Sequence, residues 1–109
     1  LPALWRAEKI QKKAAKSGMT AMSESEAAEA LTGAAERFLA GGGEKEAGEL
    51  LFAAVRCAQM RGIDPEDALN SASDGFTARF SAAEGAAGAG GLDALGAEEK
   101  AALWKHENE

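Results

Sequence analysis

The chain has 109 residues, which is the size of one domain, and its formal net charge is −6. That charge disfavours non-specific nucleic-acid binding, and no run of about 20 apolar residues is present that would span a membrane. Ala and Glu are abundant and only 2 Pro occur, so we expect an all-α protein. The single Cys57 excludes an internal disulfide and fits a reducing, cytoplasmic compartment. The sequence shows no signal-peptide pattern and begins at Leu1 rather than Met, which fits a piece of a longer protein.

The first predicted helix runs from about residue 2 to 17 and ends at Gly18. It carries a narrow apolar stripe and a series of cations that includes Lys12 and Lys16. Two interpretations of these cations stay open. They form a solvated face, as charge runs commonly do, or one or two of them approach phosphate groups.

The second predicted helix begins after Ser23, which forms a capping box with Glu26, and runs to about Leu39. Glu26 and Glu29 are spaced i, i+3, so their carboxylates leave one face of the helix about one turn apart. Acids in a first turn commonly complement the helix dipole, and a metal site is the alternative. The glycine-rich residues 40–43 then predict a short connection between two helices.

The third predicted helix spans residues 44–61, and Gly62 ends it. Glu46 and Glu49 repeat the i, i+3 spacing, and residues 50–55 are apolar on every side, which predicts a buried helix. A carboxylate beside a buried segment needs a cation, so we expect the two acidic pairs to face each other and hold a divalent metal. Cys57 is predicted to be a small core residue.

Asp64 and Pro65 predict the start of a fourth helix that runs to about Glu84. Its apolar positions recur at helical spacing and predict a buried stripe of Leu69, Ala72, Phe76, Phe80 and Ala83. Residues 85–91 contain only Gly and Ala and predict a flexible tether. A short helix over residues 97–107 carries Trp104, whose more common use is as a core plug and whose alternative use is as a stacking surface.

The chain resembles the C-terminal catalytic domain of the MazG nucleoside triphosphate pyrophosphohydrolases. The resemblance covers nearly the whole chain and rests on seven motifs that occur in the same order as in the family. They are LPAL at 1–4, QKKAA at 11–15, Glu26-Ala-Ala-Glu29, Glu46-Ala-Gly-Glu49-Leu-Leu-Phe, Gly62-Ile-Asp-Pro-Glu-Asp-Ala-Leu69, Phe76 with Arg79-Phe80, and Leu103-Trp104. The resemblance implies a single all-α domain over residues 1–109, with a four-helix-bundle-like fold that a homodimer or higher oligomer completes.

The resemblance also implies Mg²⁺-dependent cleavage of NTPs and dNTPs to monophosphate and pyrophosphate, a reaction of nucleotide metabolism. By resemblance, the catalytic metal ligands are Glu26, Glu29, Glu46 and Glu49, and the substrate contacts are Arg79 and Trp104. The charge of the first helix adds Lys12 and Lys16 as candidate phosphate contacts. Mg²⁺ prefers oxygen ligands, and a metal would relieve the repulsion between four carboxylates.

The chain also departs from the family pattern. The second acidic pair of the family ends in Asp, and here it ends in Glu49. The family sequence A-N-x-K-F is replaced by Ala72-Ser73-Asp74-Gly75-Phe76, so an amide and a phosphate-binding lysine are lost. The alternative function is therefore a degenerate member that binds a nucleotide or partner, or serves oligomerisation, without turnover.

Overall fold

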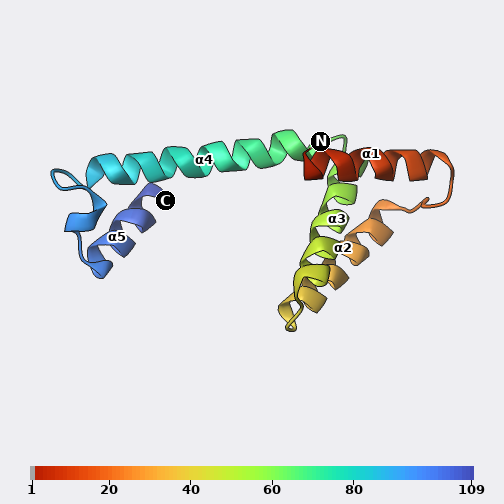
Figure 1. The fold of residues 1–109 in the computed structure, drawn as a ribbon, viewed down its shortest axis with the longest axis horizontal. Coiled ribbons are helices and arrows are strands. Elements are labelled where there is room, and N and C mark those ends of the chain that lie inside the picture. Colours follow the sequence, from red (N-terminus) through yellow and green to blue (C-terminus); the bar gives the residue numbers. More distant parts are fainter. Residues whose placement is uncertain (1) are drawn as a thin grey trace. The chain divides into compact units, whose positions relative to one another are not determined.

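The computed structural model describes residues 2–109, and these contain helices and no strand, which confirms the predicted all-α class (Figure 1). The helices match the predicted ranges to within about two residues. They are α1 (Ala3–Lys16), α2 (Glu24–Leu39), α3 (Glu44–Met60), α4 (Pro65–Ala86), the 3₁₀ turn η1 (Leu92–Ala94) and α5 (Ala97–Glu107). The fourth helix thus extends two residues into the predicted tether. Within the described range, no helix is both long and apolar enough to cross a membrane.

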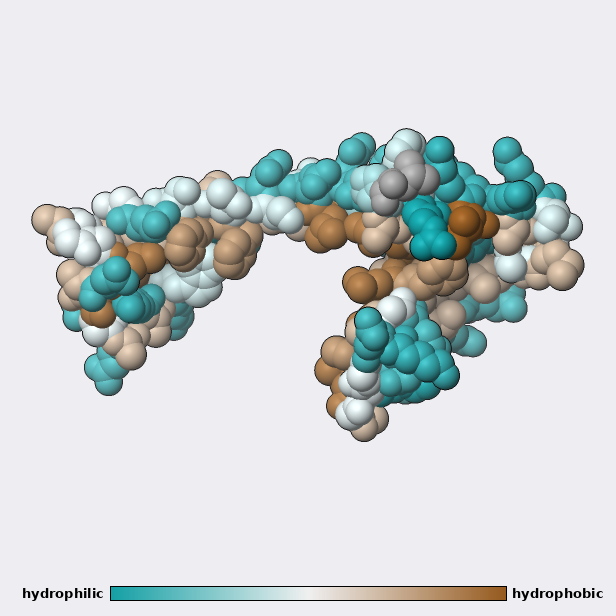
Figure 2. Space-filling model, in the orientation of Figure 1, coloured by the Kyte–Doolittle hydropathy of each residue, from teal (hydrophilic) through white to brown (hydrophobic). Residues whose placement is uncertain are grey.

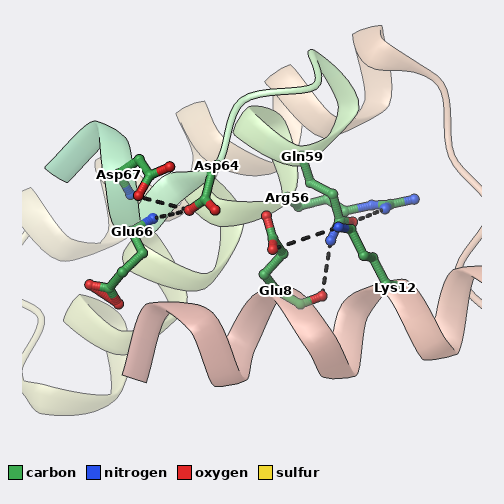
Figure 3. A network of polar contacts seen from close by, with 7 residues as sticks. All are labelled: Glu8, Lys12, Arg56, Gln59, Asp64, Glu66 and Asp67. Atoms are coloured by element: carbon green, nitrogen blue, oxygen red, sulfur yellow. Dashed lines mark hydrogen bonds and ion pairs between the residues drawn. The ribbon is translucent and has the colours of Figure 1, made fainter. Parts of the chain in front are cut away.

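Local hydrogen bonds explain where the helices begin. Ser23 Oγ accepts from the Glu26 backbone N–H at 3.1 Å, and Glu26 Oε1 accepts from the Ser23 backbone N–H at 3.0 Å, which completes the predicted capping box. Asp64 Oδ1 accepts from the backbone N–H groups of Glu66 and Asp67 at 2.9 and 3.2 Å, so it caps α4 (Figure 3). Both caps involve residues within one turn, which is why the sequence could predict them.

The chain divides into two compact units, the first ending at Ala68 and the second beginning at Leu69. In the first unit, α2 and α3 form an antiparallel hairpin, and α1 lies across it and contacts α3 (Figure 1). The hairpin turns tightly at Gly42, where an added Cβ would lie 2.5 Å from the Cβ of Glu46. Only glycine fits this approach, so the turn holds the end of α2 against the first turn of α3.

Two glutamine side chains hold α1 against α3. Gln11 Nε2 of α1 donates to the Phe52 carbonyl oxygen of α3 at 2.9 Å, and Gln59 Nε2 of α3 donates to the Glu8 carbonyl oxygen of α1 at 3.0 Å. Gln59 Oε1 also accepts from Arg56 Nη1 at 2.6 Å (Figure 3). These reciprocal bonds span more than forty residues of sequence and fix α1 along α3.

In the second unit, η1 reverses the chain and α5 turns back toward α4 (Figure 1). The rings of Phe76 and Trp104 pack at 5.3 Å between centroids with an interplanar angle of 57°. Trp104 is half-buried in this contact, whereas Phe76 is 53% exposed.

The apolar core of the described residues is made of small side chains. Its buried hydrophobic members are Ala27, Ala34, Val55 and Ala83, and no large side chain is fully buried. The predicted burial is wrong for several larger residues, which remain exposed in the single chain: Leu51 (59%), Phe52 (46%), Leu69 (52%), Phe76 (53%) and Phe80 (42%). Apolar surface is visible over both the hairpin and α4 (Figure 2). The helical period places these residues on apolar faces, but the neighbouring helices of each unit cover them only in part.

Candidate functional site

Of the first predicted acidic pair, Glu26 has a structural partner. Its carboxylate accepts the Ser23 backbone N–H, and this bond, followed by the Ser23 hydroxyl bond, lowers the pKa of Glu26 below the ordinary value. Glu29, one turn later, is exposed. The carboxylate of Glu26 therefore already accepts a hydrogen bond from the backbone at the start of α2.

The second predicted acidic pair is divided in the same way. Glu46 Oε1 accepts the Gly43 backbone N–H at 2.8 Å and so satisfies one of the free donors at the start of α3. Glu49 makes no such bond and lines a groove of the first unit. Each pair therefore has one member that serves its own helix.

The register of the hairpin places the two pairs at different levels. Cys57 Sγ donates to the Ala27 carbonyl oxygen at 3.3 Å, so Ala27 lies level with Cys57. Glu49 precedes Cys57 by eight residues, about 12 Å of helix, and Glu29 follows Ala27 by two residues, about 3 Å. About 9 Å along the axis therefore separates the levels of Glu29 and Glu49.

This arrangement bears on the predicted magnesium site. Among residues 2–109, no three His, Cys, Asp or Glu residues lie close enough together to hold a metal ion. Mg²⁺ requires near-octahedral oxygen ligands at about 2.1 Å, and carboxylates at separate levels of one hairpin do not fit that geometry. A shared site for Glu26, Glu29, Glu46 and Glu49 stays a prediction.

The groove has a volume of about 760 Å³ and lies between α1, α2 and α3. Its apolar lining comes from all three helices and the loop after α1, and consists of Ile10, Ala14, Met22, Ala27, Ala30, Ala34, Phe52 and Ala53. Both the size and the mostly apolar lining are typical of small-molecule sites.

Three cations and one carboxylate also line the groove. Arg37 comes from α2, whereas Lys45, Glu49 and Arg56 come from α3. In the described part of the chain, the one ion pair within 4.0 Å joins Lys12 to Glu8, so none of these four groups is neutralised by an opposite charge. Gln11 in the wall is 6% exposed, and its Oε1 has no hydrogen-bond partner.

Sequence reasoning missed the groove cations, although the pattern contained a signal. Lys45, Glu49, Phe52 and Arg56 are spaced by three or four residues, so they share one face of α3. That face combines charged side chains with one aromatic ring. A search for carboxylates alone finds only Glu49 on it.

The predicted substrate contacts lie elsewhere. Lys12 Nζ lies 3.6 Å from Glu8 Oε1, and Lys16 is exposed in the last turn of α1. Arg79 and Trp104 belong to the second unit, where Arg79 is exposed and Trp104 packs on Phe76. None of the four lines the groove.

Neither the family models nor the curated proteins give a match to this chain. The MazG relationship therefore stays a prediction that rests on the ordered sequence motifs.

Proposed function

We propose that this chain is a degenerate MazG-like helical domain that binds a nucleotide in the α1–α2–α3 groove and does not hydrolyse it. One observation carries the proposal. On the α2 side of the groove that Glu49 lines, the residues are Ala27, Ala30, Ala34 and Arg37, and none of them is a carboxylate.

The chemistry of the groove supports nucleotide binding. Phe52 is 46% exposed, and its ring offers a surface on which a base can stack. Arg37, Lys45 and Arg56 supply positive charge that no ion pair within the described residues neutralises, and charge-assisted hydrogen bonds from such groups to phosphate are among the stronger ones in proteins.

The proposal is tested by measuring binding and turnover on the same sample. We expect isothermal titration to detect binding of a non-hydrolysable NTP, and we expect no pyrophosphate from mixed NTPs and dNTPs with Mg²⁺. A Glu46→Gln, Glu49→Gln double variant gives the background of the assay. Pyrophosphate release clearly above this background would reject the non-catalytic function.

The second candidate is the Mg²⁺-dependent nucleoside triphosphate pyrophosphohydrolase itself. The observation that favours it is the position of Glu49, an unpaired carboxylate in the same groove as three cations. For this function, a water would be activated at a metal or carboxylate while the cations bind the triphosphate. This function predicts that the parent chain releases pyrophosphate from NTPs and that the Glu46→Gln, Glu49→Gln variant does not.

We also propose self-association, because the single chain leaves large apolar side chains uncovered. Leu39 is 80% exposed and Leu51 is 59% exposed, both in the hairpin and outside the groove lining. A second copy that covers them would gain roughly 1.5–3 kcal/mol for each side chain fully buried. Light scattering should show a dimer or larger species that Leu51→Glu weakens, and a monomer at all concentrations would reject the proposal.

A further inference from the structure

The charge of the groove differs from that of the whole chain. The protein carries −6, but the groove contains three cations and only one carboxylate, which leaves a local charge of +2. Because none of the four is ion-paired within the described residues, this charge is available to an occupant. An occupant with about two negative charges would neutralise it.

The groove also requires an occupant with a sizeable apolar or aromatic body. Ile10 and Phe52 both line it and are 49% and 46% exposed, so a flat or apolar group would cover surface that is now in water. The Gln11 side chain donates through Nε2 to Phe52 and leaves its Oε1 unpaired in the wall. A hydrogen-bond donor on the occupant would satisfy this acceptor after a small movement of the amide.

Triphosphates fit this site poorly without a metal. A nucleoside triphosphate without a bound cation carries about four negative charges, which exceed the groove charge of +2. A phosphate monoester carries about −1.5 to −2 at neutral pH, which matches the groove charge of +2.

We propose that the groove selects a nucleoside monophosphate and binds it without a divalent metal. The proposal rests on the proposed nucleotide-binding function and specifies its ligand. Arg37 and Lys45 lie at similar levels near the turn of the hairpin, whereas Arg56 lies about 16 Å along α3 from Lys45. The phosphate therefore lies between Arg37 and Lys45, and the base lies on the apolar floor beside Phe52. Glu49 opposes binding, since it is the one negative group of the groove.

The test is titration calorimetry with adenosine, guanosine, cytidine and uridine monophosphates, each in EDTA and again in Mg²⁺. We expect at least one monophosphate to bind with the same affinity in both buffers and more tightly than its non-hydrolysable triphosphate in EDTA. Arg37→Gln and Lys45→Gln should each weaken binding about ten-fold or more. Lys13→Gln, an exposed α1 residue outside the groove, is the matched control and should bind as the parent chain does.

Glu49→Gln separates this proposal from a magnesium site. Removal of the groove carboxylate should tighten monophosphate binding several-fold, whereas loss of a metal ligand would weaken binding in Mg²⁺. Both cations and Glu49 are exposed, so these substitutions should leave the helices intact, which circular dichroism verifies. Binding of triphosphate only in Mg²⁺, or weaker binding by Glu49→Gln, would overturn the metal-independent ligand and leave the proposed function standing. Binding of no nucleotide in either buffer would overturn both.

Discussion

The two glutamines that join α1 to α3 should respond differently to the same substitution. Gln59→Met removes two hydrogen bonds, one donated to the Glu8 carbonyl and one accepted from Arg56. At about 0.5–1.5 kcal/mol each, their loss should destabilise the first unit by about 1–3 kcal/mol. Gln11→Met also removes one bond, to the Phe52 carbonyl, but it eliminates a buried oxygen that has no partner. Relief of that desolvation is worth about 1–3 kcal/mol, so the net effect should be near zero or stabilising.

The assay uses the intrinsic fluorescence of Trp5, which lies on α1 with Lys9 Nζ 4.3 Å from its ring centroid. The chain has 2 Trp, so all variants are made in a chain that carries Trp104→Phe, in which Trp5 is the only tryptophan. We expect Gln59→Met to lower the thermal midpoint by roughly 5–15 °C, since 1 kcal/mol corresponds to about 4–8 °C in a domain of this size. Gln11→Met should stay within a few degrees of the parent background. Equal losses for the two variants would refute the reasoning, because they would show that the unpaired Gln11 oxygen has no energetic cost.

Three further predictions concern caps and packing. Asp64→Ala should destabilise the start of α4 by about 1 kcal/mol, and Asp64→Asn should not, which amide exchange in the first turn of α4 would measure. Because the pKa of Glu26 is lowered in the folded chain, its contribution to stability is present above its unfolded pKa and is lost as pH falls through the folded value. Ser23→Ala removes the hydroxyl that helps to lower the pKa of Glu26, so it should raise that pKa in a carboxyl NMR titration; an unchanged value would contradict the capping assignment. Trp104→Ala should speed amide exchange throughout α5, since the aromatic pair contributes about 0.5–1.5 kcal/mol beyond area burial, whereas Trp104→Phe should retain most of the protection.

The sequence predicted the helix boundaries because the signals that set them are local. Ser23 with Glu26, and Asp64 with Pro65, act through hydrogen bonds and dihedral preferences within a single turn. Gly62 ends α3 in the left-handed region, with φ of +71°, where residues with a side chain are rarely found. None of these signals depends on what the helix packs against.

The sequence could not predict how the acidic pairs lie relative to each other. The i, i+3 spacing shows which residues share a face of one helix, but the level of one helix against its neighbour depends on the turn and on tertiary contacts. Here the turn at Gly42 and the bond from Cys57 to Ala27 set that level. For the same reason, the sequence could not show that Arg37 of α2 lines one groove with Lys45 and Arg56 of α3.

Because the turn at Gly42 is tight, the number of residues between this turn and Glu49 sets the level of the Glu49 carboxylate along α2. An insertion of about seven helical residues, two full turns, ahead of Glu46 would shift Glu49 by about 10 Å, close to the level of Glu29, and would keep it on the same face of α3. The carboxylate of Glu49 would then lie at the level of another acid instead of opposite alanines. A change in length alone, with every acidic residue retained, is therefore enough to assemble or dismantle an ion-binding centre in a helical hairpin of this kind.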